Sequence, residues 1–127
     1  MITVHTFLNL GAGIFSDFLA DDALMAGPDL AIDATDPTDA LHETYAVGNR
    51  VGGDARGRSW PSQVRSLSVG DVLVVEEAAF VVAPIGFTPV DAERVDRACR
   101  EGVRRPELFD LDTETWRAEW PDRPATA

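Results

Sequence analysis

The chain has 127 residues, of which 45% are hydrophobic and 26% are charged, proportions typical of a globular protein of one domain. Its one cysteine, Cys99, excludes an intrachain disulfide and with it a secreted disulfide scaffold. The basic residues are eleven arginines and no lysine, and the formal charge of −11 disfavours direct binding to phosphate backbones.

The first third of the chain predicts a strand and then a helix. Residues 2–8 are rich in residue types that favour strands and nearly alternate between apolar and polar types, which predicts a strand. Apolar residues recur at helical spacing over residues 14–25, so we expect a helix that the Gly-Pro pair at 27–28 ends. Residues 28–37 should form a loop or a short strand.

A second helix is predicted to begin after Asp36, whose side chain can cap it, with Pro37 at the first helical position. Gly48 lies where this helix should end. The segment Asn49–Gln63 is rich in Gly, Arg and Ser, and this composition predicts a mobile loop.

Three short strands are predicted next, over residues 72–75, 79–83 and 85–88. The first two are separated by only a few residues and should form an antiparallel hairpin. A further helix should open at Asp91 or just before it. We expect Cys99 on the apolar stripe of this helix, as a small buried side chain.

The C-terminal segment carries large apolar side chains, which usually pack against something. They are Leu108, Phe109, Leu111, Trp116 and Trp120. The last residues, Pro121–Ala127, should be frayed. Together these elements predict a single α+β domain over residues 1–127, with a small antiparallel sheet and two to three packed helices.

The most distinctive motif is RSLSVGDVLVV at residues 65–75, followed by FVVAPIGF at residues 80–87. It resembles the YodL-like domain family of small bacterial proteins over about residues 40–90. In that family an Arg/His-Ser-Leu-Ser-Val-x-Asp segment leads into a strand, and a second strand closes with a Gly-Phe or Gly-Trp pair. The resemblance implies an accessory gene of a plasmid, phage or conjugative element, and it implies no reaction.

The motif has two interpretations. Asp71 can hydrogen-bond its own turn and pair with Arg65, while Ser66 and Ser68 satisfy backbone groups at a bend. Alternatively, Arg65, Ser66 and Ser68 hold an anionic ligand or a partner, with Trp60 close by in the sequence. Turn chemistry is the more common use of such residues before a strand.

Acidic residues dominate the first part of the chain, because eight acids and no Lys or Arg precede Arg50. On the predicted helix Asp17 and Asp21 lie one turn apart with Asp22 beside them, so their carboxylates should share one exposed face. This face either serves solubility alone or imitates nucleic acid and binds a basic partner.

No catalytic residue, metal site or cofactor site is predicted. His5 and His42 have no ligand partners at a recognised metal-binding spacing. Acids follow the glycine-rich turn at residues 11–13, and they would repel a phosphate. Whether the protein is an enzyme stays open, with the balance against it; a hydrolase would need Cys99 or Ser66 as its nucleophile.

The favoured function is a non-enzymatic accessory protein of a mobile element or phage that acts on a host protein. We expect it in the cytoplasm and not in the membrane, since no apolar segment approaches the ~20 residues of a membrane span. One alternative is an acidic mimic of nucleic acid that inhibits a host enzyme. Another is a small-ligand or RNA-binding module that uses the Arg50–Arg65 segment, in which Arg56 and Arg58 lie near Trp60.

Overall fold

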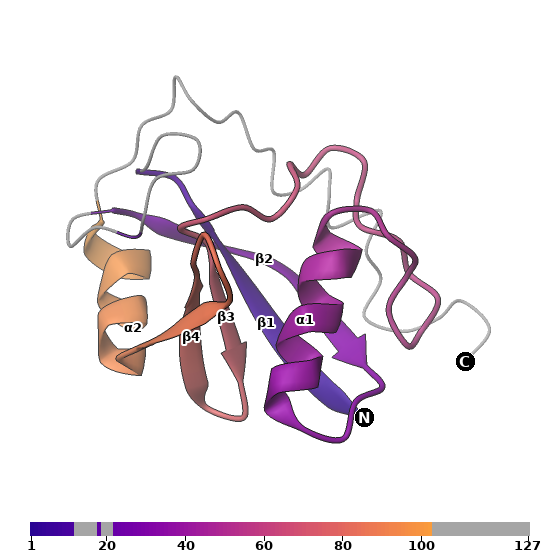
Figure 1. The fold of residues 1–127 in the computed structure, drawn as a ribbon. Coiled ribbons are helices and arrows are strands. Elements are labelled where there is room, and N and C mark those ends of the chain that lie inside the picture. Colours follow the sequence, from indigo (N-terminus) through magenta and orange to yellow (C-terminus); the bar gives the residue numbers. More distant parts are fainter. Residues whose placement is uncertain (12–17, 19–21, 103–127) are drawn as a thin grey trace.

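Five strands form one antiparallel sheet in the order β2-β1-β3-β4-β5 (Figure 1). A computed structural model describes residues 1–11, 18 and 22–102 of the chain. Its elements are β1 (Ile2–Asn9), β2 (Leu24–Ile32), α1 (Pro37–Gly48), β3 (Val72–Val75), β4 (Ala78–Val82), β5 (Phe87–Val90) and α2 (Ala92–Glu101). The predicted α+β class, with a small antiparallel sheet and two helices, is confirmed.

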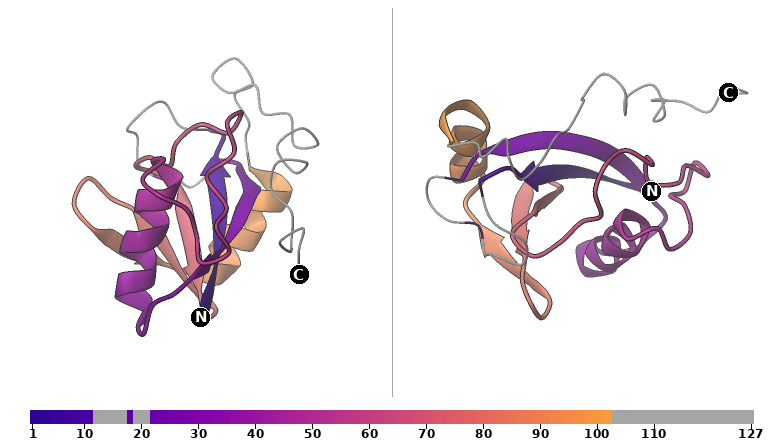
Figure 2. Two further views of the ribbon diagram at one scale, coloured as in Figure 1. Left: turned by 90° about the vertical axis from the view of Figure 1, so that its right-hand side faces the viewer. Right: turned by 90° about the horizontal axis from the view of Figure 1, so that it is seen from above.

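The two helices cover opposite faces of the sheet (Figure 2). Successive side chains of a strand point to opposite faces, so each strand contributes to both cores. Val4 and Leu8 of β1 and Leu73 of β3 are fully buried on the α1 face, where Leu41 of α1 packs against them. On the other face the buried residues gather around α2; they are Phe18, Leu24, Val72, Ala79, Val81, Val95 and Ala98.

β2 begins earlier than the sequence suggested, and the prediction of a helix through Met25 is wrong at its end. Met25 lies in β2, and Gly27 lies within the same strand instead of ending a helix. A bulge explains this: Gly27 and Pro28 together face Thr6 of β1, so the register shifts there. The Thr6 hydroxyl donates to the Pro28 carbonyl at 2.6 Å, and a Cβ on Gly27 would lie only 2.7 Å from that hydroxyl.

Pro28 is tolerated in β2 because it occupies the bulge of an edge strand, where no ladder hydrogen bond needs its missing N–H. The rest of the predicted helix, residues 14–17 and 19–21, lies outside the described residues. So do the apolar side chains of the C-terminal segment and the frayed end predicted at Pro121–Ala127.

Both helices begin where their capping residues predict. The Asp36 carboxylate accepts from the Asp39 N–H at 2.9 Å, and the Asp91 carboxylate accepts from the Glu93 N–H at 3.1 Å. Asn49 closes α1, and Arg50 follows with a φ of 67°, in the left-handed conformation common after a helix.

The expectation that Cys99 is buried is wrong, because its side chain is exposed. Val95 and Ala98 are the residues of α2 that face the sheet. Each residue turns the helix by 100°, so Cys99 lies about 100° from Ala98 and about 40° from Val95, at the margin of that contact.

The outer edge of β2 is covered by the loop at residues 53–59. The Ala55 N–H donates to the Ala31 carbonyl at 2.7 Å, and the Ala31 N–H donates to the Asp54 carboxylate at 3.1 Å. Arg58 donates to the Asp29 carbonyl and also pairs with Asp54 at 2.7 Å. The loop therefore satisfies backbone groups that an edge strand would otherwise present to other chains.

β5 forms the other edge, and Pro89 limits what this edge can bind. The Ala83 N–H donates to the Gly86 carbonyl at the turn. From this pair onward, hydrogen-bonded and non-hydrogen-bonded residue pairs alternate along the antiparallel β4–β5 ladder. Thr88 and Val90 therefore face β4, while the backbone groups of Phe87 and Pro89 face outward. Since Pro89 has no N–H, the edge offers one donor fewer to an added strand.

Candidate functional site

The motif at residues 65–71 forms a bend that leads directly into β3. Gly70 has a φ of 94°, a conformation that residues with a side chain rarely adopt. Its N–H donates to the Val82 carbonyl at 2.9 Å, and the Val82 N–H donates to the Asp71 carbonyl at 2.8 Å. The bend is thus held against the end of β4, as the turn interpretation of the motif requires.

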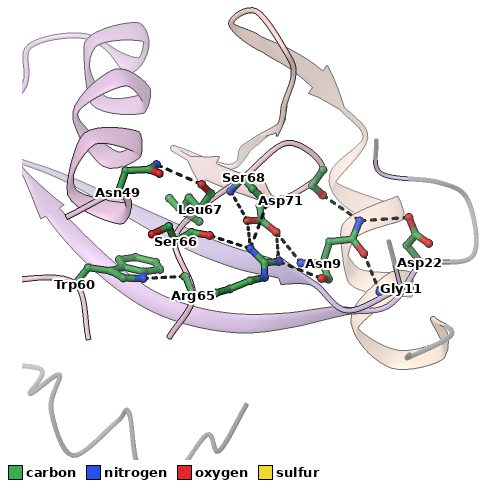
Figure 3. A network of polar contacts seen from close by, with 11 residues as sticks. Asn9, Gly11, Asp22, Asn49, Trp60, Arg65, Ser66, Leu67, Ser68 and Asp71 are labelled. Atoms are coloured by element: carbon green, nitrogen blue, oxygen red, sulfur yellow. Dashed lines mark hydrogen bonds and ion pairs between the residues drawn. The ribbon is translucent and has the colours of Figure 1, made fainter. Parts of the chain in front are cut away.

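Arg65 and Asp71 form a bidentate ion pair inside this bend (Figure 3). The two guanidinium Nη atoms each lie 2.7 Å from a different carboxylate oxygen of Asp71. Asp71 is fully buried, and the Arg65 side chain is 23% exposed. Parallel hydrogen bonds of this kind combine charge with fixed geometry, so each side chain orients the other.

Backbone groups around the pair use most of its remaining hydrogen-bonding capacity. Asp71 accepts from the N–H groups of Ser68, at 2.8 Å, and of Asn9, at 2.9 Å. Arg65 donates to the carbonyl oxygens of Asn9, at 3.1 Å, and of Ser66, at 3.0 Å. A buried charge pair is tolerated when such bonds satisfy its other lone pairs and protons.

Asn9, which was not among the predicted site residues, connects this cluster to the end of β1. Its side chain donates to the Gly70 carbonyl at 3.1 Å and to Asp22 at 3.2 Å, and it accepts from the Gly11 N–H at 2.9 Å. The available signal was a polar residue directly after Phe7 and Leu8 at the end of a strand, where a buried amide needs partners.

The predicted binding residues Trp60, Ser66 and Ser68 all contact the chain itself. The Trp60 indole N–H donates to the Arg65 carbonyl at 3.0 Å, and the ring is 4% exposed. Arg50 donates to the Ser66 hydroxyl at 2.6 Å, and Arg65 reaches the Ser68 hydroxyl at 3.4 Å. The structure thus brings four of the proposed residues together around a bend whose polar atoms bond one another.

Arg50 fixes the rest of the segment before this bend. Its guanidinium donates to the Val64 carbonyl at 2.7 Å and lies within reach of the carbonyls of Pro61 and Ser62. Asn49 donates to the carbonyls of Tyr45 and Leu67 from the end of α1. These contacts join the residues at the two ends of the segment to one another, and the mobility predicted for Asn49–Gln63 stays a prediction.

Of the acidic cluster predicted at Asp17, Asp21 and Asp22, the structure describes only Asp22, and this residue is buried. Asp22 is only 7% exposed and accepts from the Asn9 side chain, so it cannot belong to an open acidic face. Asp17 and Asp21 lie outside the described residues. Exposed acids occur instead on α1, at Asp39 and Glu43.

The two histidines and the cysteine lie apart from the motif. His5 Nδ1 is 2.9 Å from the Asp29 carboxylate, and the His42 ring meets the Phe87 ring edge-on at 5.2 Å. His42 and Cys99 are on helices that cover opposite faces of the sheet, which excludes a dyad between them. Partial burial and the Asp96 carboxylate both raise the pKa of the Cys99 thiol, so it is a poor nucleophile at neutral pH.

Neither a metal-binding group nor a membrane-spanning helix occurs in the part of the chain that the structure describes. Residues 1–11, 18 and 22–102 contain no group of three or more His, Cys, Asp or Glu that could hold a metal ion. They also contain no helix that is long and apolar enough to cross a membrane.

The comparisons with known proteins do not assign the protein to a class. No family model matches the chain, and no curated protein or solved structure is significantly similar to it.

Proposed function

We propose that the protein is a non-enzymatic accessory protein of a mobile element or phage, and that it acts in the cytoplasm by binding a host protein. The observation that carries the proposal is the closure of the Arg65–Asp71 cluster, whose charged atoms bond to the chain itself. The residues that most resembled a reactive or ligand-binding set thus serve the fold. The origin in a mobile element rests on the resemblance of residues 40–90 to the YodL-like family.

The proposal is tested by affinity capture. Tagged protein should recover one host protein in defined stoichiometry, and the two purified proteins should form the same complex. An unrelated acidic protein of similar size and charge is the control for nonspecific capture by net charge. The proposal is wrong if no host protein binds the purified chain and the chain instead turns over a small metabolite.

Mimicry of nucleic acid is a second candidate, favoured by the exposed carboxylates of Asp36, Asp39 and Glu43 along α1. It no longer has the support of Asp22, which is buried. A mimic should displace nucleic acid from its partner, with a steep dependence on salt. Replacing these three acids by Asn or Gln should abolish the displacement, and unchanged displacement would contradict mimicry.

An RNA- or ligand-binding role for Arg50–Arg65 has less support. Arg50, Arg58 and Arg65 each donate several hydrogen bonds to the chain itself, and the Trp60 ring that would stack on a base is buried.

A further inference from the structure

One part of the sheet has no helix over it among the described residues. α1 lies over β1, β2 and β3, while β4 and β5 extend beyond it on the same face (Figure 1). The side chains there are Phe80 of β4 and Phe87 and Pro89 of β5, which we call the β4–β5 face. Phe80 pairs in register with Pro89, and Phe87 lies two residues before Pro89, so the three share one face. Phe80 and Phe87 are partly exposed, and Pro89 is exposed.

α1 adds an aromatic wall to this face. The rings of His42 and Tyr45 meet the Phe87 ring at centroid distances of 5.2 Å and 6.4 Å, each at an interplanar angle of 77°. His42 is exposed and Tyr45 is partly exposed. The strands thus supply an apolar floor, and the helix supplies a side, both open to a partner.

The dimensions fit one helix. Neighbouring strands lie ~4.8 Å apart, so the two strands give a floor ~10 Å wide, close to the diameter of an α-helix with its side chains. Strands of four and five residues extend about 13–17 Å, which corresponds to roughly three helical turns. A short amphipathic helix laid beside α1 would cover the face.

The charges around the face select the partner. Residues 33–49 and 66–93, which supply the floor, the wall and their surroundings, contain no Lys or Arg. Glu76 and Glu77 are exposed on the turn between β3 and β4, at one end of the floor. Asp39 and Glu43 are exposed on the other flank of α1 and add to the negative charge nearby. A second copy of this acidic chain would be repelled, whereas a helix with basic side chains beside its apolar stripe would be attracted.

We infer that the β4–β5 face, with His42 and Tyr45, is the docking site for a basic amphipathic helix of the partner protein. The inference rests on the proposed function and names the surface and the chemistry of the partner. The apolar side chains of the helix cover Phe80 and Phe87, and its Lys or Arg side chains lie against Glu76 and Glu77.

The direct test uses a labelled helical peptide of about 15 residues as probe, with Leu and Trp on one face and Arg and Lys on the other. Fluorescence anisotropy with the full chain should show binding at about 10–100 µM that weakens several-fold from about 50 to 300 mM salt. A matched peptide with Glu in place of the basic residues should not bind. Equal binding of both peptides, or no binding of either, would overturn the inference.

Variants locate the binding. His42→Lys places a positive charge in the wall at an exposed helical position, and Phe87→Ser removes the centre of the floor; each should weaken the peptide at least about tenfold. Val51→Ser is the control, since Val51 is 66% exposed and lies outside the face. Circular dichroism checks folding, and His42→Lys decides the matter if Phe87→Ser is unstable. Wild-type affinity in His42→Lys contradicts the inference.

The captured host protein separates failure of this site from failure of the proposed function. If wild type and His42→Lys bind that protein equally well, the docking site is wrong and the interaction function stands. Self-association of the wild-type chain that His42→Lys abolishes would show that the face binds a second copy, which also contradicts the inference.

Discussion

At the scale of single residues, the Arg65–Asp71 pair has the largest expected effect on stability. Asp71→Asn keeps the shape of the side chain but leaves the partly buried guanidinium without its counter-charge. We expect a loss of about 3–5 kcal/mol in the free energy of unfolding, the usual result of breaking a buried pair from one side. Urea unfolding measures it.

The matched control is the exposed pair of His5 and Asp29, whose side chains are 49% and 60% exposed. Asp29→Asn should change stability by less than about 0.5 kcal/mol, because exposed pairs contribute little. Comparable losses in the two variants would show that the buried network is not what holds the bend.

Asp54 gives a prediction on pH. Burial opposes ionisation of its carboxyl, but the hydrogen bonds from the Arg58 side chain and from the backbone N–H groups of Arg58 and Ala31 outweigh burial, so its pKa lies below the ordinary value. A lowered pKa in the folded state contributes stability above the unfolded pKa of about 3.9, and this contribution is lost as the pH falls through the folded pKa.

Asp54→Asn should therefore cost about 2 kcal/mol at pH 7, and its deficit relative to wild type should shrink below about pH 4. Urea unfolding of both proteins from pH 3 to 7 measures the difference. A deficit that is constant over this range would mean that the charge of Asp54 contributes nothing and that only its shape matters.

The role of a residue could be predicted from the sequence when its partner lies nearby in the sequence. The capping residues Asp36 and Asp91, and the pairing of Arg65 with Asp71, are local and were predicted correctly. Asn9 was missed because its partner Asp71 lies 62 residues away, and no local pattern marks that contact. Cys99 was misplaced because helical spacing gives the apolar side of a helix only to within about one residue.

At the scale of elements, the turn between β3 and β4 is built from unfavourable residues. Glu76 and Glu77 have φ angles of 48° and 73°, so both central positions are left-handed, as in a type I′ hairpin turn. Asn-Gly is the preferred pair there, because larger side chains are strained at positive φ.

Glu76→Asn with Glu77→Gly should raise the free energy of unfolding by about 1–2 kcal/mol. The charge control is Glu76→Gln with Glu77→Gln, which removes the repulsion but retains the strain and should gain much less. Thermal unfolding compares the two. An equal gain in both variants would assign the effect to charge alone.

The elements themselves were predicted unequally. β1, α1, the β3–β4 hairpin and α2 have clear periodicity and end signals, and the structure has all four. β2 was predicted only in part, as a loop or short strand over residues 28–37, because its bulge interrupts the alternation of a strand and because a Gly-Pro pair usually marks the end of an element. The bulge exists only through Thr6 of the neighbouring strand, which the local sequence does not show.

At the scale of the whole molecule, net charge opposes folding. With a formal charge of −11, long-range repulsion destabilises the compact state. We expect the melting temperature to rise by about 2–5 °C when salt is raised from about 20 to 300 mM, because added ions screen this repulsion. Near pH 4, where carboxylates become protonated, the same salt increase should have a smaller effect. A melting temperature that falls with salt at pH 7 would contradict this.

The position of β1 in the middle of the sheet constrains how the chain can fold during synthesis. β1 leaves the ribosome before β3, with which it pairs, and Phe7 meets Val72 only after β3 has been translated. Until then β1 has only β2 beside it, and a two-stranded hairpin is marginally stable in water. The nascent protein therefore displays apolar side chains of β1, such as Val4 and Leu8, until β3 has been made, which makes it a substrate for chaperones that bind unfinished chains.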